Sequence, residues 1–132
     1  MTQKNIYVMD VIVDKMADGT KLSKALEQVY NKRRVYIPYK EEIFNVLVLD
    51  LDMSNRTANG LMRARLKTLA DVICFCQDKK ITDVATLGKS SGTEVLETIL
   101  DYCWDNMSEK EKVAFLIDTV ERNSKYIRVE II

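Results

Sequence analysis

Four positions in this chain carry the residue pattern with which α-helices usually begin. A serine or threonine is favoured there because its side-chain oxygen accepts a hydrogen bond from a backbone N–H group that has no partner inside the helix. The four residues are Ser54, Thr68, Ser91 and Ser108. The last three are each followed three residues later by an acidic residue, which completes a capping box. Apolar residues then recur at intervals of three and four, so the sequence predicts a mainly α-helical fold.

The N-terminal part of the chain is expected to form helices followed by a short strand. Apolar residues over 6–16 fit one face of a helix, which Asp18 and Gly19 would end, although the β-branched residues of this stretch also fit a strand. A clearer helix begins at Thr20. Its C-terminal end carries a basic run, where positive charge suits the helix dipole. The run consists of Lys32, Arg33 and Arg34.

Two short segments rich in β-branched and aromatic residues lie far apart in the chain, at 35–37 and 126–132. Pro38 ends the first segment and cannot donate a ladder hydrogen bond, which favours an edge strand. We expect the two segments to pair as a small two-stranded antiparallel ribbon. Between them, the helix that follows Ser108 is expected to bury one apolar stripe. The stripe consists of Val113, Leu116, Ile117 and Val120.

The chain has 132 residues, of which 47% are hydrophobic, and this is enough apolar material for one core. We expect three segments packed as one compact unit: an N-terminal helical extension at 1–45, a helical domain at 46–107, and a C-terminal helix and strand at 108–132. A charged or polar residue interrupts every apolar stretch within a few positions. No membrane span is therefore expected, and the predicted location is the cytoplasm.

The sequence contains no histidine, which removes the usual proton shuttle near neutral pH and the commonest metal ligand. No phosphate-binding or metal-binding motif is recognisable, so we expect no enzymatic activity, no metal and no cofactor. Cys74, Cys76 and Cys103 have no paired spacing and are expected to be free thiols in the core. Twenty positive and twenty negative residues create no overall attraction for nucleic acid, so any DNA contact must come from a local patch.

One candidate contact lies in the helix expected after Ser54. Arg56 and Asn59 are three residues apart, so a guanidinium and a carboxamide share one helix face. The alternative interpretation is that both side chains are simply solvated, or that they pair with Asp50 and Asp52.

A second candidate contact lies near residue 88. Gly88 would permit a tight turn, and Ser91 with Glu94 would form the capping box that opens a long helix. The amide groups at such a helix start, with Lys89 beside them, could hold one phosphate. The alternative is purely structural, because a glycine turn before a capped helix is common in proteins that bind no anion.

Three segments in this part of the chain, 51–61, 66–72 and 87–95, read LDMSNRTANGL, LKTLADV and LGKSSGTEV. In this order they resemble the C-terminal domain of the bacterial RNA polymerase alpha subunit, over about residues 46–104. The resemblance implies a helical domain with helix-hairpin-helix motifs that docks on the minor groove of A·T-rich DNA. It also implies surfaces for activators and sigma factors. The N- and C-terminal extensions have no counterpart in that domain.

The resemblance places the family's DNA contacts on particular residues of this chain. The contacting arginine and asparagine correspond to Arg56 and Asn59. The hairpin contacts correspond to Gly88, Lys89 and Ser91, with Glu94 as the neighbouring acidic residue. Because few phosphates would be neutralised, we expect weak binding with loose sequence preference and a shallow salt dependence.

The sequence departs from the family pattern at three positions. The family's second hairpin lysine is Ser90 here, so one phosphate contact is lost. Asn55 replaces an apolar residue before the arginine. Gly60 replaces a cysteine or similar residue after the asparagine and is expected to loosen this helix by up to about 1 kcal/mol.

Two further interpretations remain open. The basic run at 32–34 could be a second DNA element or merely a solvated helix end. The fold could also serve as a protein-interaction module that does not touch DNA, in which case Tyr102, Trp104 or Tyr126 should contribute to an exposed apolar patch. The expected partners are A·T-rich DNA and either RNA polymerase or a transcription regulator, in a bacterial or phage-like setting.

Overall fold

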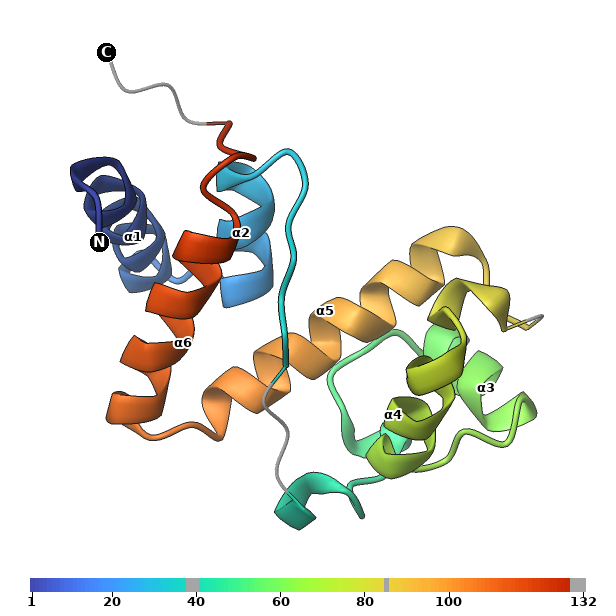
Figure 1. The fold of residues 1–132 in the computed structure, drawn as a ribbon. Helices are drawn as coiled ribbons and strands as arrows, with labels where there is room; N and C mark the ends of the chain where they lie inside the picture. The colour runs from blue at the N-terminus through green and yellow to red at the C-terminus, as the bar shows by residue number, and fades with distance from the viewer. Residues whose placement is uncertain (38–40, 85, 129–132) are drawn as a thin grey trace. The chain divides into compact units, whose positions relative to one another are not determined.

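The computed structural model describes residues 1–37, 41–84 and 86–128, and these residues are mainly helical (Figure 1). The α-helices among them are α1 Gln3–Ala17, α2 Leu22–Val29, α3 Asn55–Arg63, α4 Leu69–Asp78, α5 Lys89–Asp105 and α6 Glu109–Arg122. The short 3-10 helices are η1 Glu41–Ile43, η2 Val48–Asp50 and η3 Ile81–Asp83. Over the same residues, β-pairing is limited to isolated bridges. The expected mainly α-helical fold is confirmed.

Contacts between residues divide the chain into two compact units. The first unit consists of Met1–Ile37 together with Cys103–Ile132, and the second consists of Pro38–Tyr102. The long helix α5 therefore contributes most of its residues to the second unit and its last turn to the first.

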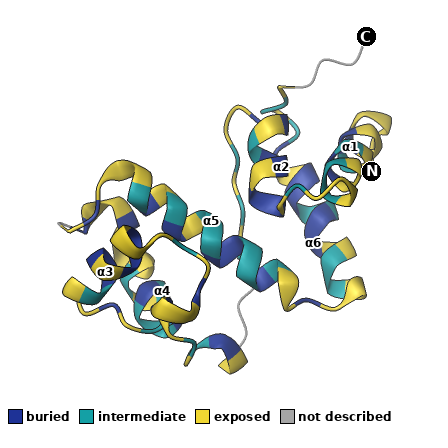
Figure 2. Cartoon of the chain, turned by 180° about the vertical axis from the view of Figure 1, so that it is seen from behind, coloured by how far each residue is buried: buried dark blue, intermediate teal, exposed yellow. Residues whose placement is uncertain are grey.

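The first unit is built from α1, α2 and α6, with α1 in contact with both other helices. Figure 2 shows the buried residues of α2 in dark blue beside exposed ones in yellow. The most deeply buried side chains of this unit come from all three helices: Val8, Ile12, Leu22, Leu26, Val29 and Val120. The segment at 6–16 is thus part of a helix and not a strand. Gly19 ends α1 as expected, with a left-handed φ of 99° that glycine adopts at no steric cost.

The predicted pairing of 35–37 with 126–132 is wrong. In its described part, residues 126–128, the C-terminal segment instead forms one antiparallel bridge, between Ile127 and Tyr30, directly after α2. The N–H of Asn31 donates to the carbonyl of Tyr126 at 2.7 Å. Tyr30, the residue directly after α2, already has an extended backbone conformation. The C-terminal segment therefore pairs with Tyr30 and not with 35–37. Residues 129–132 lie outside the described part of the chain.

The capping box at the start of α6 is confirmed, because Ser108 accepts from the N–H of Glu111 and Glu111 accepts from the N–H of Ser108. The predicted buried stripe is only partly correct. Val113 is 50% exposed and Ile117 is half-buried. The buried face is turned around the helix from the expected one and consists of Phe115, Leu116, Thr119, Val120 and Asn123.

The second unit contains η1, η2, α3, α4, η3 and the first four turns of α5. Its most deeply buried side chains are Val48, Leu61, Leu69, Val72 and Val95. The capping box of Thr68 and Asp71 at the start of α4 is confirmed. Cys74 and Cys76 of α4 are exposed, so the expectation of a core thiol is wrong for these two residues, and only Cys103 is buried.

The turn between α3 and α4 is closed by a left-handed residue that is not glycine. Arg65 has a φ of 65°. Its N–H donates to the carbonyl of Met62 at 3.0 Å, and the N–H of Leu66 donates to the carbonyl of Leu61 at 2.9 Å. This pair of hydrogen bonds, with both leucines buried, defines a Schellman motif. It reverses the chain within a few residues, so that α4 starts close to the end of α3.

Within the three described ranges of the chain, no helix combines the length and the apolar character that crossing a membrane requires.

Candidate nucleic-acid interface

Helix α3 presents Arg56 and Asn59 to solvent. Ser54 caps the helix as predicted, accepting a hydrogen bond from the N–H of Thr57 at 3.3 Å. Thr57 and the apolar residues Ala58 and Leu61 are buried, whereas Arg56 and Asn59 are both exposed. The helix thus separates a buried face from a face that carries the guanidinium and the carboxamide, in the arrangement that the sequence predicts.

The carboxylate of Glu94 on α5 is bound at the start of α3. One of its oxygens accepts from the hydroxyl of Ser54 at 2.9 Å and from the hydroxyl of Thr57, and the other accepts from the N–H of Ser54 at 3.1 Å. The hydrogen bond from Thr57 and those from Ser54 hold the pKa of Glu94 below its usual value of 4.5. This negative charge also complements the positive end of the α3 dipole.

The contact made by Glu94 corrects the predicted capping box of Ser91 and Glu94. Helix α5 begins at Lys89, three residues earlier than a helix capped by Ser91 would, so Ser91 lies inside its first turn. Glu94 is then too far along the helix to bind back at its start, and its carboxylate binds the donors of α3 instead. The sequence carried no signal for this contact, because its partners lie 40 and 37 positions away.

At its other end, α3 approaches the segment before α5 very closely. The hydroxyl of Thr86 donates to the carbonyl of Gly60 at 2.6 Å. A Cβ atom added to Gly60 would lie 2.5 Å from Cδ2 of Leu87 and 3.0 Å from the carbonyl oxygen of Thr86. Gly60 therefore permits this close packing, and a Cβ atom there would force Leu87 and Thr86 to shift, a role that its place in the helix did not reveal. Together with Glu94, it fixes α3 against residues 86–94.

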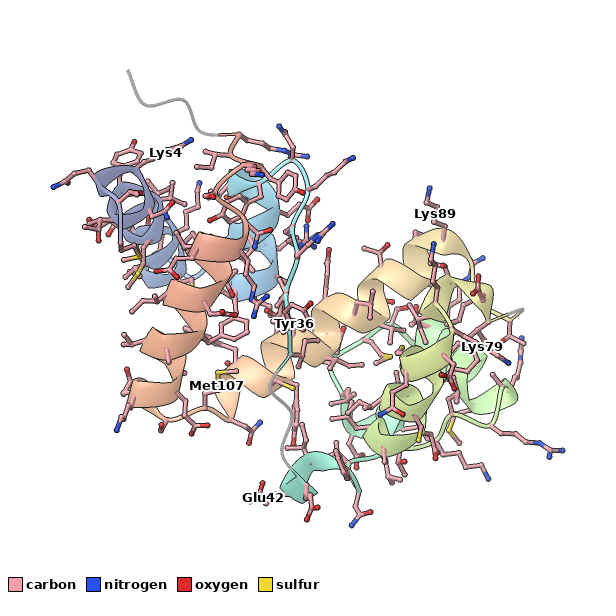
Figure 3. All side chains as sticks on the ribbon, viewed as in Figure 1. Lys4, Tyr36, Glu42, Lys79, Lys89 and Met107 are labelled. Carbon is pink, nitrogen blue, oxygen red and sulfur yellow. The ribbon has the colours of Figure 1, made fainter. Side chains whose placement is uncertain are left out.

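The hairpin residues Gly88 and Lys89 are exposed, and Ser91 is half-buried. The side chain of Lys89 extends outward from the start of α5 (Figure 3). Gly88 does not have a left-handed φ, and a Cβ added there would meet nothing within 4 Å. The conformational freedom that the sequence offers at Gly88 is therefore not used for a left-handed turn in this structure. The N–H groups in the first turn of α5 have no acceptor inside the helix and can face an anion.

The structure brings the two predicted groups of contact residues onto neighbouring elements. Arg56 and Asn59 lie on α3, and Gly88, Lys89 and Ser91 lie on the segment against which α3 packs. Ser90, which stands where the family has its second lysine, is exposed.

The remaining predicted contacts belong to other parts of the fold. The basic run at 32–34 belongs to the first unit. It follows α2, which ends at Val29, and so does not form the end of that helix as expected. Tyr102, Trp104 and Tyr126 are each half-buried, so none of them provides the large exposed ring that the protein-interaction alternative called for.

Comparison with known proteins shows that part of the chain is similar to a subunit of RNA polymerase. Two curated proteins with partial similarity are both described as DNA-directed RNA polymerase subunit alpha. The protein from Gracilaria tenuistipitata var. liui is 34% identical over 61 residues, which is 46% of this chain and 19% of the relative. The protein from Herpetosiphon aurantiacus is 31% identical over 86 residues, which is 65% of this chain and 25% of the relative.

The chain thus spans about a quarter or less of the length of these relatives. No protein-family model and no solved structure matches it. The similarity confirms the resemblance to the RNA polymerase alpha subunit that the sequence motifs indicated.

Proposed function

We propose that this protein is a non-enzymatic, cytoplasmic DNA-binding protein with a transcription-related role. Its second unit corresponds to the C-terminal domain of the alpha subunit, with α3 and α4, and then η3 and α5, as helix-hairpin-helix motifs. This unit contacts the minor groove of A·T-rich DNA weakly. The observation that most directly supports this proposal is that Arg56 and Asn59 are both exposed on one helix, which hydrogen bonds hold against the start of α5. RNA polymerase or a transcription regulator is the proposed protein partner.

The physical chemistry of the two elements fits the minor groove. A narrow A·T-rich groove concentrates negative potential, which favours an inserted arginine such as Arg56. The start of α5 offers backbone N–H groups and the exposed charge of Lys89 to a phosphate next to the groove. Since Glu94 already occupies the start of α3, the start of α5 is the better of the two for binding a phosphate.

The number of cations near this interface sets the strength of binding. Arg56 and Lys89 are supplemented at most by the exposed Arg63 and Arg65 at the end of α3. Few counterions would be released at this interface, so its own contribution to the affinity and to the salt dependence of binding is small.

The test is a fluorescence anisotropy titration at low salt with A·T-rich and G·C-rich duplexes. Wild type should prefer the A·T-rich duplex. Arg56→Ala should lose about 1–3 kcal/mol of binding free energy, or roughly fivefold to more than a hundredfold in affinity. Lys67→Ala, which removes one exposed charge from the same unit, is the matched control and should bind nearly as wild type.

Equal binding by wild type and Arg56→Ala would contradict the proposal, as would a lack of binding to either duplex. Either result would favour the alternative in which the same fold binds a protein partner without touching DNA.

A further inference from the structure

Two segments of the first unit carry positive charge without any acidic residue. Residues 28–37 contain Lys32, Arg33 and Arg34, and residues 122–128 contain Arg122, Lys125 and Arg128. Neither segment contains Asp or Glu. Six of the 20 basic residues of an otherwise neutral chain therefore lie in two short stretches.

The fold brings these two stretches together. The bridge between Tyr30 and Ile127 aligns them, and Nε of Arg128 donates to the side-chain oxygen of Asn31 at 2.9 Å. The buried amide of Asn123 adds a second connection: it accepts from the N–H of Arg34 at 2.6 Å and donates to the carbonyl of Arg34 at 2.8 Å. Segments about 90 positions apart in sequence thus lie side by side, and we call the part of the molecule that carries Lys32, Arg33, Arg34, Arg122, Lys125 and Arg128 the basic surface.

The basic surface is open to solvent. Five of its cations are exposed and Arg33 is half-buried. The exposed residues are Lys32, Arg34, Arg122, Lys125 and Arg128. Tyr36 is 66% exposed, and the guanidinium of Arg122 lies 4.3 Å from the centre of its ring. Tyr36 can be located in Figure 3.

The acidic residues around this surface do not neutralise it. Asp118 accepts from Nε of Arg122 at 2.8 Å, so it balances the charge of that residue. Glu27 is bound to Lys24 at 3.1 Å, a residue outside the surface. The hydrogen bond and charge of Lys24 lower the pKa of Glu27, and Arg33 and Arg128 contribute to this shift from farther away. Six basic residues outnumber these two acids and the exposed Glu121 next to Arg122, so the basic surface keeps a net positive charge that a polyanion can neutralise.

We propose that the basic surface binds the sugar-phosphate backbone of nucleic acid without reading its sequence. Arginine presents a planar fork of donors that matches phosphate oxygens, and lysine adds point charges. Nucleic acid is the polyanion that presents phosphates in a regular array, and where its bases are unpaired the exposed ring of Tyr36 can also stack on one of them. This surface is built from residues other than Arg56 and Lys89, so it constitutes a second contact that goes beyond the proposed function.

The test uses the full chain with Lys32→Gln, Arg34→Gln and Lys125→Gln combined. These exposed side chains are suitable because Asn31, Asn123 and Arg128 make the contacts that hold the two segments together. The matched control combines Lys4→Gln, Lys15→Gln and Lys110→Gln, which removes the same charge from other parts of the first unit. Circular dichroism verifies that both variants are folded, and Lys125→Gln alone replaces the first combination if it is not.

The probe is a mixed-sequence duplex of about 30 base pairs, titrated at several salt concentrations. Loss of three phosphate contacts should lower the slope of log affinity against log salt by about 2–3, and the affinity at about 0.1 M salt by more than tenfold. The control combination should bind as wild type. For Lys125→Gln alone, the expected slope change is about 0.9.

Equal binding by the two combinations would overturn the inference. So would a variant that loses binding to poly-glutamate but keeps binding to DNA, since the surface would then serve an acidic protein. Arg56→Ala separates this inference from the proposed function. It should abolish the preference for A·T-rich DNA, whereas the basic-surface variant should weaken binding to every duplex equally.

Discussion

The expected effect of Gly60 on stability is different in the sequence and in the structure. From its place in a helix, glycine is expected to cost about 1 kcal/mol relative to alanine. In the fold, however, the α carbon of Gly60 faces Leu87 and the carbonyl of Thr86, and there is no room for a methyl group. Gly88 presents the reverse case. Its place before a helix suggests a tight turn that glycine permits, yet its φ is not left-handed and its surroundings are open.

We predict that Gly60→Ala is less stable than wild type. Overpacking of this kind typically costs about 1–3 kcal/mol, which exceeds the gain of about 1 kcal/mol in helix propensity. The net loss in the free energy of unfolding should be about 1 kcal/mol, measured by urea denaturation. Gly88→Ala is the control and should change this free energy by less than about 0.5 kcal/mol. A Gly60→Ala protein as stable as wild type would show that Leu87 can move aside.

At the scale of the secondary-structure element, the contact between α3 and α5 depends on the ionised form of Glu94. Hydrogen bonds from Thr57 and Ser54 lower the pKa of Glu94 below 4.5, so the folded state favours the carboxylate. The resulting stabilisation is fully present above about pH 4.5 and is lost as pH falls through the lowered pKa.

We therefore predict that wild type loses more unfolding free energy than Glu94→Gln between about pH 6 and pH 3. At neutral pH, Glu94→Gln should be about 1–2 kcal/mol less stable than wild type. The substitution replaces a charged acceptor by a neutral amide, and hydrogen bonds to a neutral acceptor are weaker. Asp71, whose pKa is also lowered by hydrogen bonds from Thr68 and Lys67, is present in both proteins and cancels in the comparison. Glu121→Gln controls for the loss of one negative charge. Parallel pH profiles for wild type and Glu94→Gln would refute the contact.

The elements that the sequence predicted well are those defined by neighbouring residues. The caps at Ser54, Thr68 and Ser108 depend on donors and acceptors three residues away, so their patterns are visible in sequence. The pattern of Ser91 and Glu94 is of the same kind, but a distant set of donors competed successfully for the carboxylate. The pairing of Ile127 with Tyr30 could not be predicted, because two extended segments of similar composition offer several registers.

The candidate DNA contacts also divide into features set by neighbouring residues, which the sequence predicts, and contacts between distant residues, which it does not. Exposure of Arg56 and Asn59 follows from helix periodicity, which sequence reveals. The close approach of α3 to residues 86–94 depends on Gly60 and Glu94, whose partners are remote in sequence. For the basic surface, the sequence revealed only the run at 32–34. Its other half, at 122–128, could be joined to it only through the long-range hydrogen bonds of Asn123 and Asn31.

For the molecule as a whole, the main finding is that each of the two units has its own buried core. The second unit comprises about 65 residues, a size at which a single core gives only marginal stability although many such domains fold alone. It nevertheless buries Val48, Leu61 and Leu69 almost completely. Its helices are also well capped, with Ser54 and Thr68 at two of their starts.

We predict that a protein consisting of residues 38–102 alone folds into a helical domain. It should show the far-ultraviolet circular dichroism of α-helix and a cooperative urea transition, at a lower midpoint than the full chain because it is small. Leu61→Ala in this fragment should cost about 2–5 kcal/mol and leave it largely unfolded. The fragment lacks the basic surface, so its DNA binding should depend less steeply on salt than that of the full chain while remaining sensitive to Arg56→Ala. A fragment without cooperative unfolding would show that the core of the second unit is stable only with the rest of the chain attached.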